Sequence, residues 1–259
     1  MSEVLLPVLY TLFVWWFSTG VILYLDGLPR WTFKWTMLAA TVLLAVALVG
    51  LSATADDTRT SGAYLAFTCA LVVWGWKETA FLMGYVTGPR RTACPPAARG
   101  WQRVGYAVQA VMYHELALLA LLATVVALTW GQPNQVGSWT FATLWVMRLS
   151  AKLNVFLGVR NLNEEFLPEN LRYLESYFTR RSMNGLFPVS IAASLAIAVP
   201  MWQIGVAQGA TTFAVTAWTF VATLLSLAIL EHALMMLPLP SQLLWRWGMR
   251  SREDTARRA

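Results

Sequence analysis

The stretch VMYHELALLALLATVVALTW, residues Val111–Trp130, decides the fold. It is long enough to cross the hydrocarbon core of a bilayer, which takes a helix of about 20 apolar residues. His114 and Glu115 nevertheless stand near its start. The second of the chain's two histidines, His232, also adjoins an acid, in the run AILEHALMML (Ala228–Leu237). The sequence therefore combines a membrane-spanning pattern with titratable groups inside it.

The composition of the whole chain is that of a membrane protein. Of 259 residues, 58% are hydrophobic and 12% are charged, whereas soluble domains carry about 25% charged residues. Apolar runs of span length fall near 4–25, 33–54, 62–86, 103–130, 138–158, 187–208 and 212–237. We therefore predict an all-α fold, a polytopic membrane bundle of about seven transmembrane helices.

Basic residues outside these runs gather on one predicted side of the membrane. That side holds Arg30, Lys34, Arg90, Arg91, Arg99, Arg103, Arg160, Arg172, Arg180, Arg181, Arg246, Arg250, Arg252, Arg257 and Arg258. The opposite side holds Arg59, together with Asp56 and Asp57. By the positive-inside rule the basic side is cytoplasmic, so we predict a periplasmic N-terminus and a cytoplasmic C-terminus. No basic stripe lies on a separate soluble domain, so nucleic acid is not an expected partner.

The chain is predicted to form one transmembrane domain, residues 1–245, followed by a basic cytoplasmic tail, 246–259. Its largest extramembrane piece is the loop near 159–186. There Leu167, Leu171, Leu174 and Phe178 recur at helical spacing, which predicts a short amphipathic helix. That helix either lies on the inner membrane surface or packs on the end of the bundle. Tryptophans near the predicted span ends indicate an interfacial belt: Trp31, Trp35, Trp101, Trp130, Trp139, Trp245 and Trp247.

Ionisable residues inside the predicted spans are the candidate functional groups. They are Lys77, Glu78, His114, Glu115, Arg148, Lys152, Glu231 and His232. A lone charge at the bilayer centre costs about 2.5–3.5 kcal/mol, so such groups are expected to face one another or water. At 1.5 Å per residue, their depths agree to within about 10 Å. We predict that these groups form one polar cluster and that the loop carrying Glu164 and Glu165 caps it. The cluster and the loop would together form a cytoplasm-facing pocket.

Two interpretations of the cluster follow from charge and ligand type. In the first, Lys77, Arg148 and Lys152 balance Glu78, Glu115 and Glu231 in a neutral network that holds the helices in register. In the second, Glu78, His114, Glu115, Glu231 and His232 ligate iron, manganese or zinc. Di-iron bundles use Glu-x-x-His, whose side chains share a helix face. Here each histidine adjoins its glutamate, and neighbours on a helix point about 100° apart.

Two further interpretations concern larger ligands. A neutral histidine in an apolar helix can hold the metal of a tetrapyrrole from one side, and Ala110 and Ala117 leave room beside His114. Transport is the other possibility, since charges near the midplane are typical of transporters. The paired broken helices of that class are not evident in the sequence.

Several segments resemble one family of purple phototrophic bacteria. They are WWFSTGVILYLDGLPR (Trp15–Arg30), ETAFLMGYVTGPRR (Glu78–Arg91), YHELALL (Tyr113–Leu119), AKLNVFLGVRNLNEEFLPENLRYLESYF (Ala151–Phe178) and RSMNGLFPVS (Arg181–Ser190). The chain resembles PuhE, also called photosynthetic complex assembly protein 2, over most of its length. The polar pattern of Lys152–Phe178 is the most specific part, because hydrophobicity does not dictate it.

This resemblance implies a multi-pass protein of the bacterial inner membrane that helps to build reaction-centre and light-harvesting complexes or adjusts the supply of bacteriochlorophyll. It implies reaction-centre or light-harvesting subunits, bacteriochlorophyll or a precursor as partners besides the lipid bilayer. It carries over no catalytic residue, so a non-enzymatic factor is favoured. The alternative is a membrane metalloenzyme whose Glu/His site acts on a tetrapyrrole or a lipid.

Overall fold

The computed structural model describes residues 2–237 and 239–258, and its description of side chains ends at residue 252. The predicted tail therefore lies partly outside the described side chains, Arg257 and Arg258 included. The long helices are α1 (Ser2–Asp26), α2 (Phe33–Ala53), α3 (Thr60–Leu82), α4 (Gly100–Thr129), α5 (Val136–Leu157), α6 (Leu186–Gly205) and α7 (Thr212–Leu234), followed by α8 (Arg246–Arg258). Short 3-10 helices are η1 (Arg30–Thr32), η2 (Glu164–Phe166), η3 (Glu169–Tyr177) and η4 (Ser241–Trp245). The predicted all-α class is confirmed.

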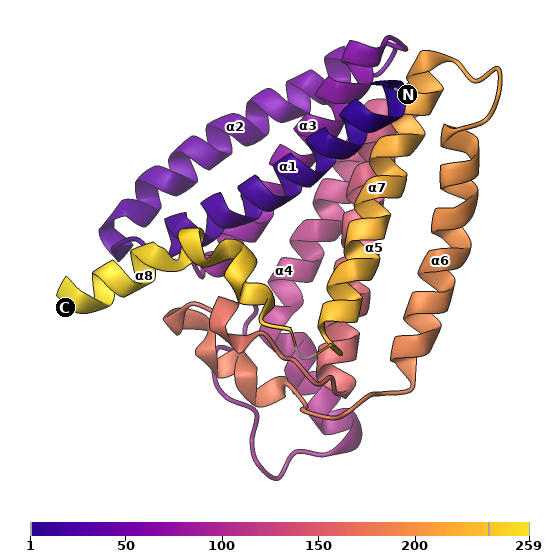
Figure 1. The fold of residues 1–259 in the computed structure, drawn as a ribbon. Helices are drawn as coiled ribbons and strands as arrows, with labels where there is room; N and C mark the ends of the chain where they lie inside the picture. Colours follow the sequence, from indigo (N-terminus) through magenta and orange to yellow (C-terminus); the bar gives the residue numbers. More distant parts are fainter. Residues whose placement is uncertain (1, 238, 259) are drawn as a thin grey trace.

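Helices α1–α7 run alongside one another, and α8 lies across the C-terminal half of α1 (Figure 1), where the Ser251 hydroxyl donates to the Tyr24 carbonyl at 2.7 Å. The α4–α5 loop meets the α2–α3 loop where the Asn134 backbone N–H donates to the Ala55 carbonyl at 2.9 Å. At the other end, the Asn161 N–H donates to the Met235 carbonyl at 2.9 Å, which joins the chain after α5 to the chain after α7. Successive helices therefore alternate in direction.

Six of the described helices are long and apolar enough to cross a membrane: α1, α2, α3, α4, α6 and α7. The sequence predicts about seven spans, and the difference is α5. Its 22 residues would cover about 33 Å at 1.5 Å per residue. Arg148, Lys152 and Asn154 make α5 too polar to count by composition alone.

The centre of the bundle is formed by α3 and α7, whose apolar windows are 50% and 56% buried, against 17% or less in the other candidate spans. The main core lies toward the α2–α3 loop. There Phe67 stacks on Phe220 with ring centroids 4.4 Å apart, and Tyr64 meets Phe220 edge-on. Gly75, further along α3, has only Ile22 within 4 Å of the position of a Cβ atom. The packing around Phe67 is therefore dense, whereas the Gly75 face of α3 borders open space.

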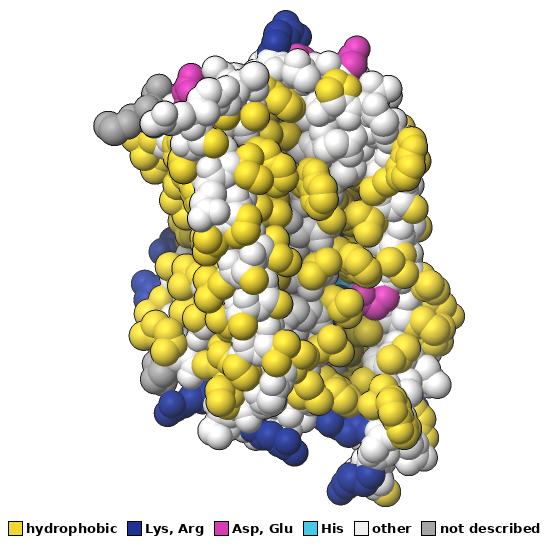
Figure 2. All heavy atoms as spheres, turned by 90° about the vertical axis from the view of Figure 1, so that its right-hand side faces the viewer, with side chains coloured by type: hydrophobic (Ala, Val, Ile, Leu, Met, Phe, Trp, Pro, Cys, Tyr) yellow, Lys and Arg dark blue, Asp and Glu magenta, His cyan; other side chains and the backbone are white. Residues whose placement is uncertain are grey.

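The surface has a mainly apolar middle and charged ends. Figure 2 shows apolar side chains over the middle of one face, interrupted by an acidic side chain, with basic side chains at one end and a few charges of both signs at the other. Trp31, Trp35, Trp101, Trp130 and Trp139 are all at least half exposed, as an interfacial belt requires. Trp245 departs from that prediction: it is 5% exposed and donates from Nε1 to the Trp16 carbonyl at 2.9 Å.

The loop between α5 and α6 contains η2 and the predicted short amphipathic helix, which is the 3-10 helix η3. Leu171, Leu174 and Tyr177 of η3 are buried against Ala110 of α4. Of the two predicted placements, the loop therefore adopts the one on the end of the bundle. An isolated bridge between Val159 and Arg180 closes it.

Candidate functional site

Three helices bring six ionisable side chains together at the end of the bundle that carries this loop. Lys77 and Glu78 come from α3, His114 and Glu115 from α4, and Arg148 and Lys152 from α5. We call these six residues the buried charge cluster after its enclosed members Lys77, Glu78 and His114; the side chains of Arg148, Lys152 and Glu115 are 50%, 32% and 25% exposed. Arg148 and Lys152 are one helical turn apart, so both side chains lie on one face of α5. The predicted convergence of spans three, four and five is present in the structure.

Lys77 is the most enclosed member of the cluster, with 0% exposure. Its Nζ lies 2.6 Å from His114 Nε2 and 3.4 Å from Glu78 Oε1. The same ammonium lies 5.2 Å from the centroid of the Trp74 ring, within range of a cation–π interaction. A buried ammonium without such partners would be strongly destabilising.

Ion pairs extend from Lys77 to the other members. Arg148 Nε lies 3.8 Å from Glu78 Oε1. Lys152 forms a salt bridge with Glu115 and lies 3.3 Å from His114 Nε2. The cluster thus contains three basic side chains and two carboxylates. Glu231, near Arg148, supplies the third acid that the neutral-network interpretation requires.

His114 is held by an unusual backbone contact. Its N–H donates to the Thr87 carbonyl at 2.8 Å, because the loop after α3 lies directly on α4. Gly88 makes this approach possible: a Cβ atom there would lie 2.0 Å from the Gln109 carbonyl oxygen. The His114 ring also packs on Phe81, with centroids 4.2 Å apart. Loop and ring together fix the imidazole beside Lys77.

The hydrogen bonds of both histidines bear on ligand binding. An ammonium only donates, so His114 Nε2 accepts from Lys77 and the ring proton belongs on Nδ1. His114 Nδ1 is buried and has no hydrogen-bond partner among the described residues. His232 Nε2 lies 2.9 Å from Ser150 Oγ, and its Nδ1 lies 2.9 Å from the Ala228 carbonyl. Neither histidine offers a free lone pair to a metal.

A cavity of about 940 Å³ adjoins the cluster. We call it the central cavity. Its walls come from α1, α3, α4, α5, α7, η4 and the loop after α5, and they are mainly apolar. Its ionisable lining residues are Glu78, His114, Glu115, Arg148, Lys152 and Glu231. The arrangement is a large apolar chamber with charged and hydrogen-bonding groups on part of its wall.

Glu231 and His232 take different places, although the sequence analysis grouped them. Glu231 lines the central cavity, and its Oε1 accepts from Trp15 Nε1 at 2.8 Å. His232 points to α5, toward Ser150, and has no contact with the buried charge cluster. Neighbours on a helix diverge by about 100°, so α7 can direct only one of the pair into the cavity.

Glu164 and Glu165 lie outside the cavity, contrary to the predicted capping role of these two side chains. Glu164 Oε1 accepts from Arg180 at 2.6 Å near the surface, and Glu165 is exposed. The loop does cover the cavity, but it does so with Leu162, Asn163, Phe166 and Leu167. The polar residues after α5 therefore correctly predicted that this loop covers the cavity, but the side chains that do so are not the two predicted glutamates.

No group of three or more His, Cys, Asp or Glu side chains within residues 2–237 and 239–258 is arranged to hold a metal ion. Lysine and arginine occupy the space between the predicted ligands: Lys77 and Lys152 approach His114, and Lys152 also approaches Glu115. The geometry thus gives the metal interpretation no support.

Sequence reasoning missed Trp15 and the Thr87 carbonyl. Trp15 is 216 positions from Glu231, and it reads as one more aromatic residue in an apolar span. The only local signal for the second was Gly88, followed by Pro89, which marks a turn.

Comparison with known proteins gives a relationship over the full length. A relative from Rhodobacter capsulatus, named "Uncharacterized 30.4 kDa protein in puhA 5'region", is 42% identical over 260 residues, covering 99% of this chain and 94% of the relative. No solved structure matches the chain. A family model described as "Protein of unknown function (DUF3623)" matches residues 1–256. The chain therefore belongs to the DUF3623 family.

Proposed function

We propose that this protein is a non-enzymatic membrane factor that assists the assembly of photosynthetic reaction-centre and light-harvesting complexes by holding a bacteriochlorophyll or a precursor. The central cavity carries the proposal. Support for the context comes from the relative named for the puhA 5' region and from the resemblance to PuhE. The membrane in question is the bacterial inner membrane.

The size and the walls of the cavity support the proposal. Its volume of about 940 Å³ lies at the upper end of the range for small-molecule and cofactor sites, about 300–1,000 Å³. Apolar walls suit a macrocycle with a hydrocarbon tail. Charged and polar groups on one wall suit its carbonyl or carboxylate substituents, and His114 Nδ1–H is a buried donor without a partner there.

The histidine contacts favour one mode of holding over another. Axial ligation of a pigment metal needs a free imidazole lone pair. Lys77 occupies His114 Nε2, and both nitrogens of His232 are engaged. We therefore infer that a pigment is held by packing and by hydrogen bonds to its substituents, and that His114 does not ligate its metal.

Filling the cavity tests this function. Gly75 lines the cavity and has only Ile22 nearby, so Gly75→Leu places a side chain in the empty space. The variant is purified from a phototrophic host in mild detergent. We expect its bacteriochlorophyll content to be lower than that of the wild type by a factor of about ten or more, equivalent to a loss of ~1.4 kcal/mol in binding free energy. Pigment is measured by absorption after solvent extraction, per mole of protein.

Gly105→Leu is the matched control. Gly105 is also a helical glycine with open space around it, but it does not line the cavity. This variant should keep the wild-type pigment content, and both variants should keep the wild-type melting temperature. Pigment retained in full by Gly75→Leu, or no pigment in the wild type, would contradict the proposal.

The orientation follows from the charges and from α5. We propose that α5 crosses the membrane as the seventh span, which puts the N-terminus in the periplasm and the arginine-rich end in the cytoplasm. A fluorescent-protein fusion after the last residue should then fluoresce, and an alkaline phosphatase fusion there should be inactive. An active phosphatase at the C-terminus would contradict this topology.

A further inference from the structure

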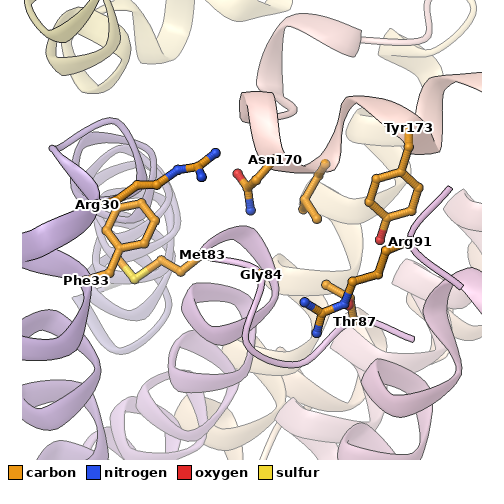
Figure 3. A pocket seen from close by; sticks show the side chains of 9 residues that line it. Arg30, Phe33, Met83, Gly84, Thr87, Arg91, Asn170 and Tyr173 are labelled. Atoms are coloured by element: carbon orange, nitrogen blue, oxygen red, sulfur yellow. The ribbon is translucent and has the colours of Figure 1, made fainter. Parts of the chain in front are cut away.

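A second, smaller cavity lies at the arginine-rich end, apart from the central cavity. Its volume is about 220 Å³. It is formed where η1 and the start of α2 meet the loop after α3 and the 3-10 helix η3 (Figure 3). We call it the interface pocket; its lining residues are Arg30, Phe33, Met83, Gly84, Thr87, Arg91, Asn170, Leu171 and Tyr173.

Two hydroxyl groups in the interface pocket, those of Thr87 and Tyr173, lie close enough to bond to each other and have no other partner in the described structure. Thr87 is 1% exposed. Two hydroxyls that bond only to each other leave one proton without an acceptor. Buried hydroxyls are nearly always paired, and leaving one unpaired is costly. Burial raises the pKa of the Tyr173 phenol, so this hydroxyl keeps its proton and can donate. An acceptor is expected in the pocket.

Two exposed arginines line the interface pocket. Figure 3 shows Arg30 on one side, with its guanidinium turned toward Asn170, and Arg91 on the other side, below Tyr173 and beside Thr87. Neither arginine forms an ion pair or a side-chain hydrogen bond within the described residues, and no acidic residue lines the pocket. Asn170 Nδ2 donates to the Leu82 carbonyl at 3.1 Å, which holds η3 against the end of α3. The pocket thus presents two cations and a pair of hydroxyls with one unused proton on a fixed frame.

Its position in the bundle selects the kind of anion. The pocket adjoins η1, which leads directly into α2, and the positive end of the helix dipole there favours negative charge. Trp31 and Trp35 are 71% and 60% exposed beside it and fit the level of the lipid headgroups. Arginine binds phosphate through paired N–H donors.

We propose that the interface pocket binds one phosphate group, supplied by the headgroup of an anionic phospholipid at the arginine-rich end of the bundle. Arg30 and Arg91 neutralise its charge, and the Thr87–Tyr173 hydroxyl pair donates its unused proton to a phosphate oxygen. This site is independent of the central cavity and does not rest on the proposed function. A free phosphate ion shares the same chemistry, and the experiment distinguishes the two sources.

The test uses the full-length protein in detergent after lipid removal. Dioctanoyl phosphatidylglycerol, dioctanoyl phosphatidylcholine and inorganic phosphate are titrated separately, with binding measured by native mass spectrometry. We expect the double variant Arg30→Gln/Arg91→Gln to weaken phosphatidylglycerol binding at least about tenfold, because two charge-assisted contacts are lost. Thr87→Val, which keeps the side-chain shape, should weaken it about threefold through one lost hydrogen bond.

Arg172→Gln is the matched control, because Arg172 is an exposed arginine next to Tyr173 that does not line the pocket. It should bind as the wild type does. Equal losses in Arg172→Gln and in the double variant would overturn the proposal, since they indicate general electrostatic attraction. So would unchanged binding in the double variant. Tight binding of inorganic phosphate without the lipid would support the site and assign it to the free ion. Equal melting temperatures show that the variants fold.

Discussion

Replacing Glu78 with Gln is expected to lower the free energy of unfolding by about 3–5 kcal/mol, the effect of removing one partner from a buried ion pair. Lys77 is fully buried, and Glu78 is the carboxylate nearest its ammonium. The amide of Gln still accepts a hydrogen bond, but it carries no charge. The ammonium would then remain in an apolar interior beside neutral His114 and the second cation, Lys152. Unfolding in detergent, followed by tryptophan fluorescence against denaturant, measures the change.

A double variant separates charge pairing from other roles of Glu78. Lys77→Met/Glu78→Gln removes both charges, so it should recover most of the stability lost by the single variant, to within about 1–2 kcal/mol of the wild type. Glu175→Gln, an exposed acid of η3, is the control and should change nothing. If Glu78→Gln has the same free energy of unfolding as the wild type, the buried charge cluster does not hold the bundle together by ion pairing.

Arg252→Met is the second large effect, and it acts on the junction of α8 with α1. The Arg252 guanidinium binds both carboxylate oxygens of Asp26 at 2.8 and 3.0 Å and donates to the carbonyls of Glu165 and Phe166. The Asp26 side chain is 1% exposed. The substitution leaves that carboxylate without its partner, which costs about 3 kcal/mol or more.

The expected result is the release of α8 from the bundle. Amide hydrogen exchange in the peptides that cover the start of α8 should become at least about tenfold faster, because exchange reports local opening. Arg250→Met is the control, since Arg250 lies exposed in the same helix without a partner among the described side chains. Exchange that is unchanged in Arg252→Met would show that the apolar contacts of η4 and α8 suffice to hold the helix.

The helices could be predicted from the sequence because the length of each apolar run decides where a span can form. The predicted span 33–54 agrees with α2 (Phe33–Ala53) to within one residue at each end. The third span was predicted to reach 86 and ends at Leu82, because Gly84 takes a positive φ of 82° in the turn that follows. A hydropathy pattern does not register such a turn. Whether α5 spans the membrane depends on its neighbours, and composition alone leaves it out.

The candidate site could be predicted in part. The depths of the charged residues along α3, α4 and α5 were enough to predict that they form one cluster. Each of these helices carries two such residues, either adjacent or one turn apart. The rotation of α7 was not predictable, so His232 was grouped with Glu231 although it faces Ser150. The Trp15–Glu231 and Asp26–Arg252 contacts join residues more than 200 positions apart. No local pattern announces contacts of that range.

The polarity of α5 also bears on how the protein is made. A helix with Arg148 and Lys152 leaves the translocon for lipid with difficulty, since each central charge costs about 2.5–3.5 kcal/mol. The carboxylates of Glu78 and Glu115, on α3 and α4, are synthesised before these bases. We therefore expect α5 to enter the bilayer alongside helices that the ribosome has already delivered. Glu78 and Glu115 would then be needed for the cotranslational insertion of α5, before they contribute to the stability of the finished bundle.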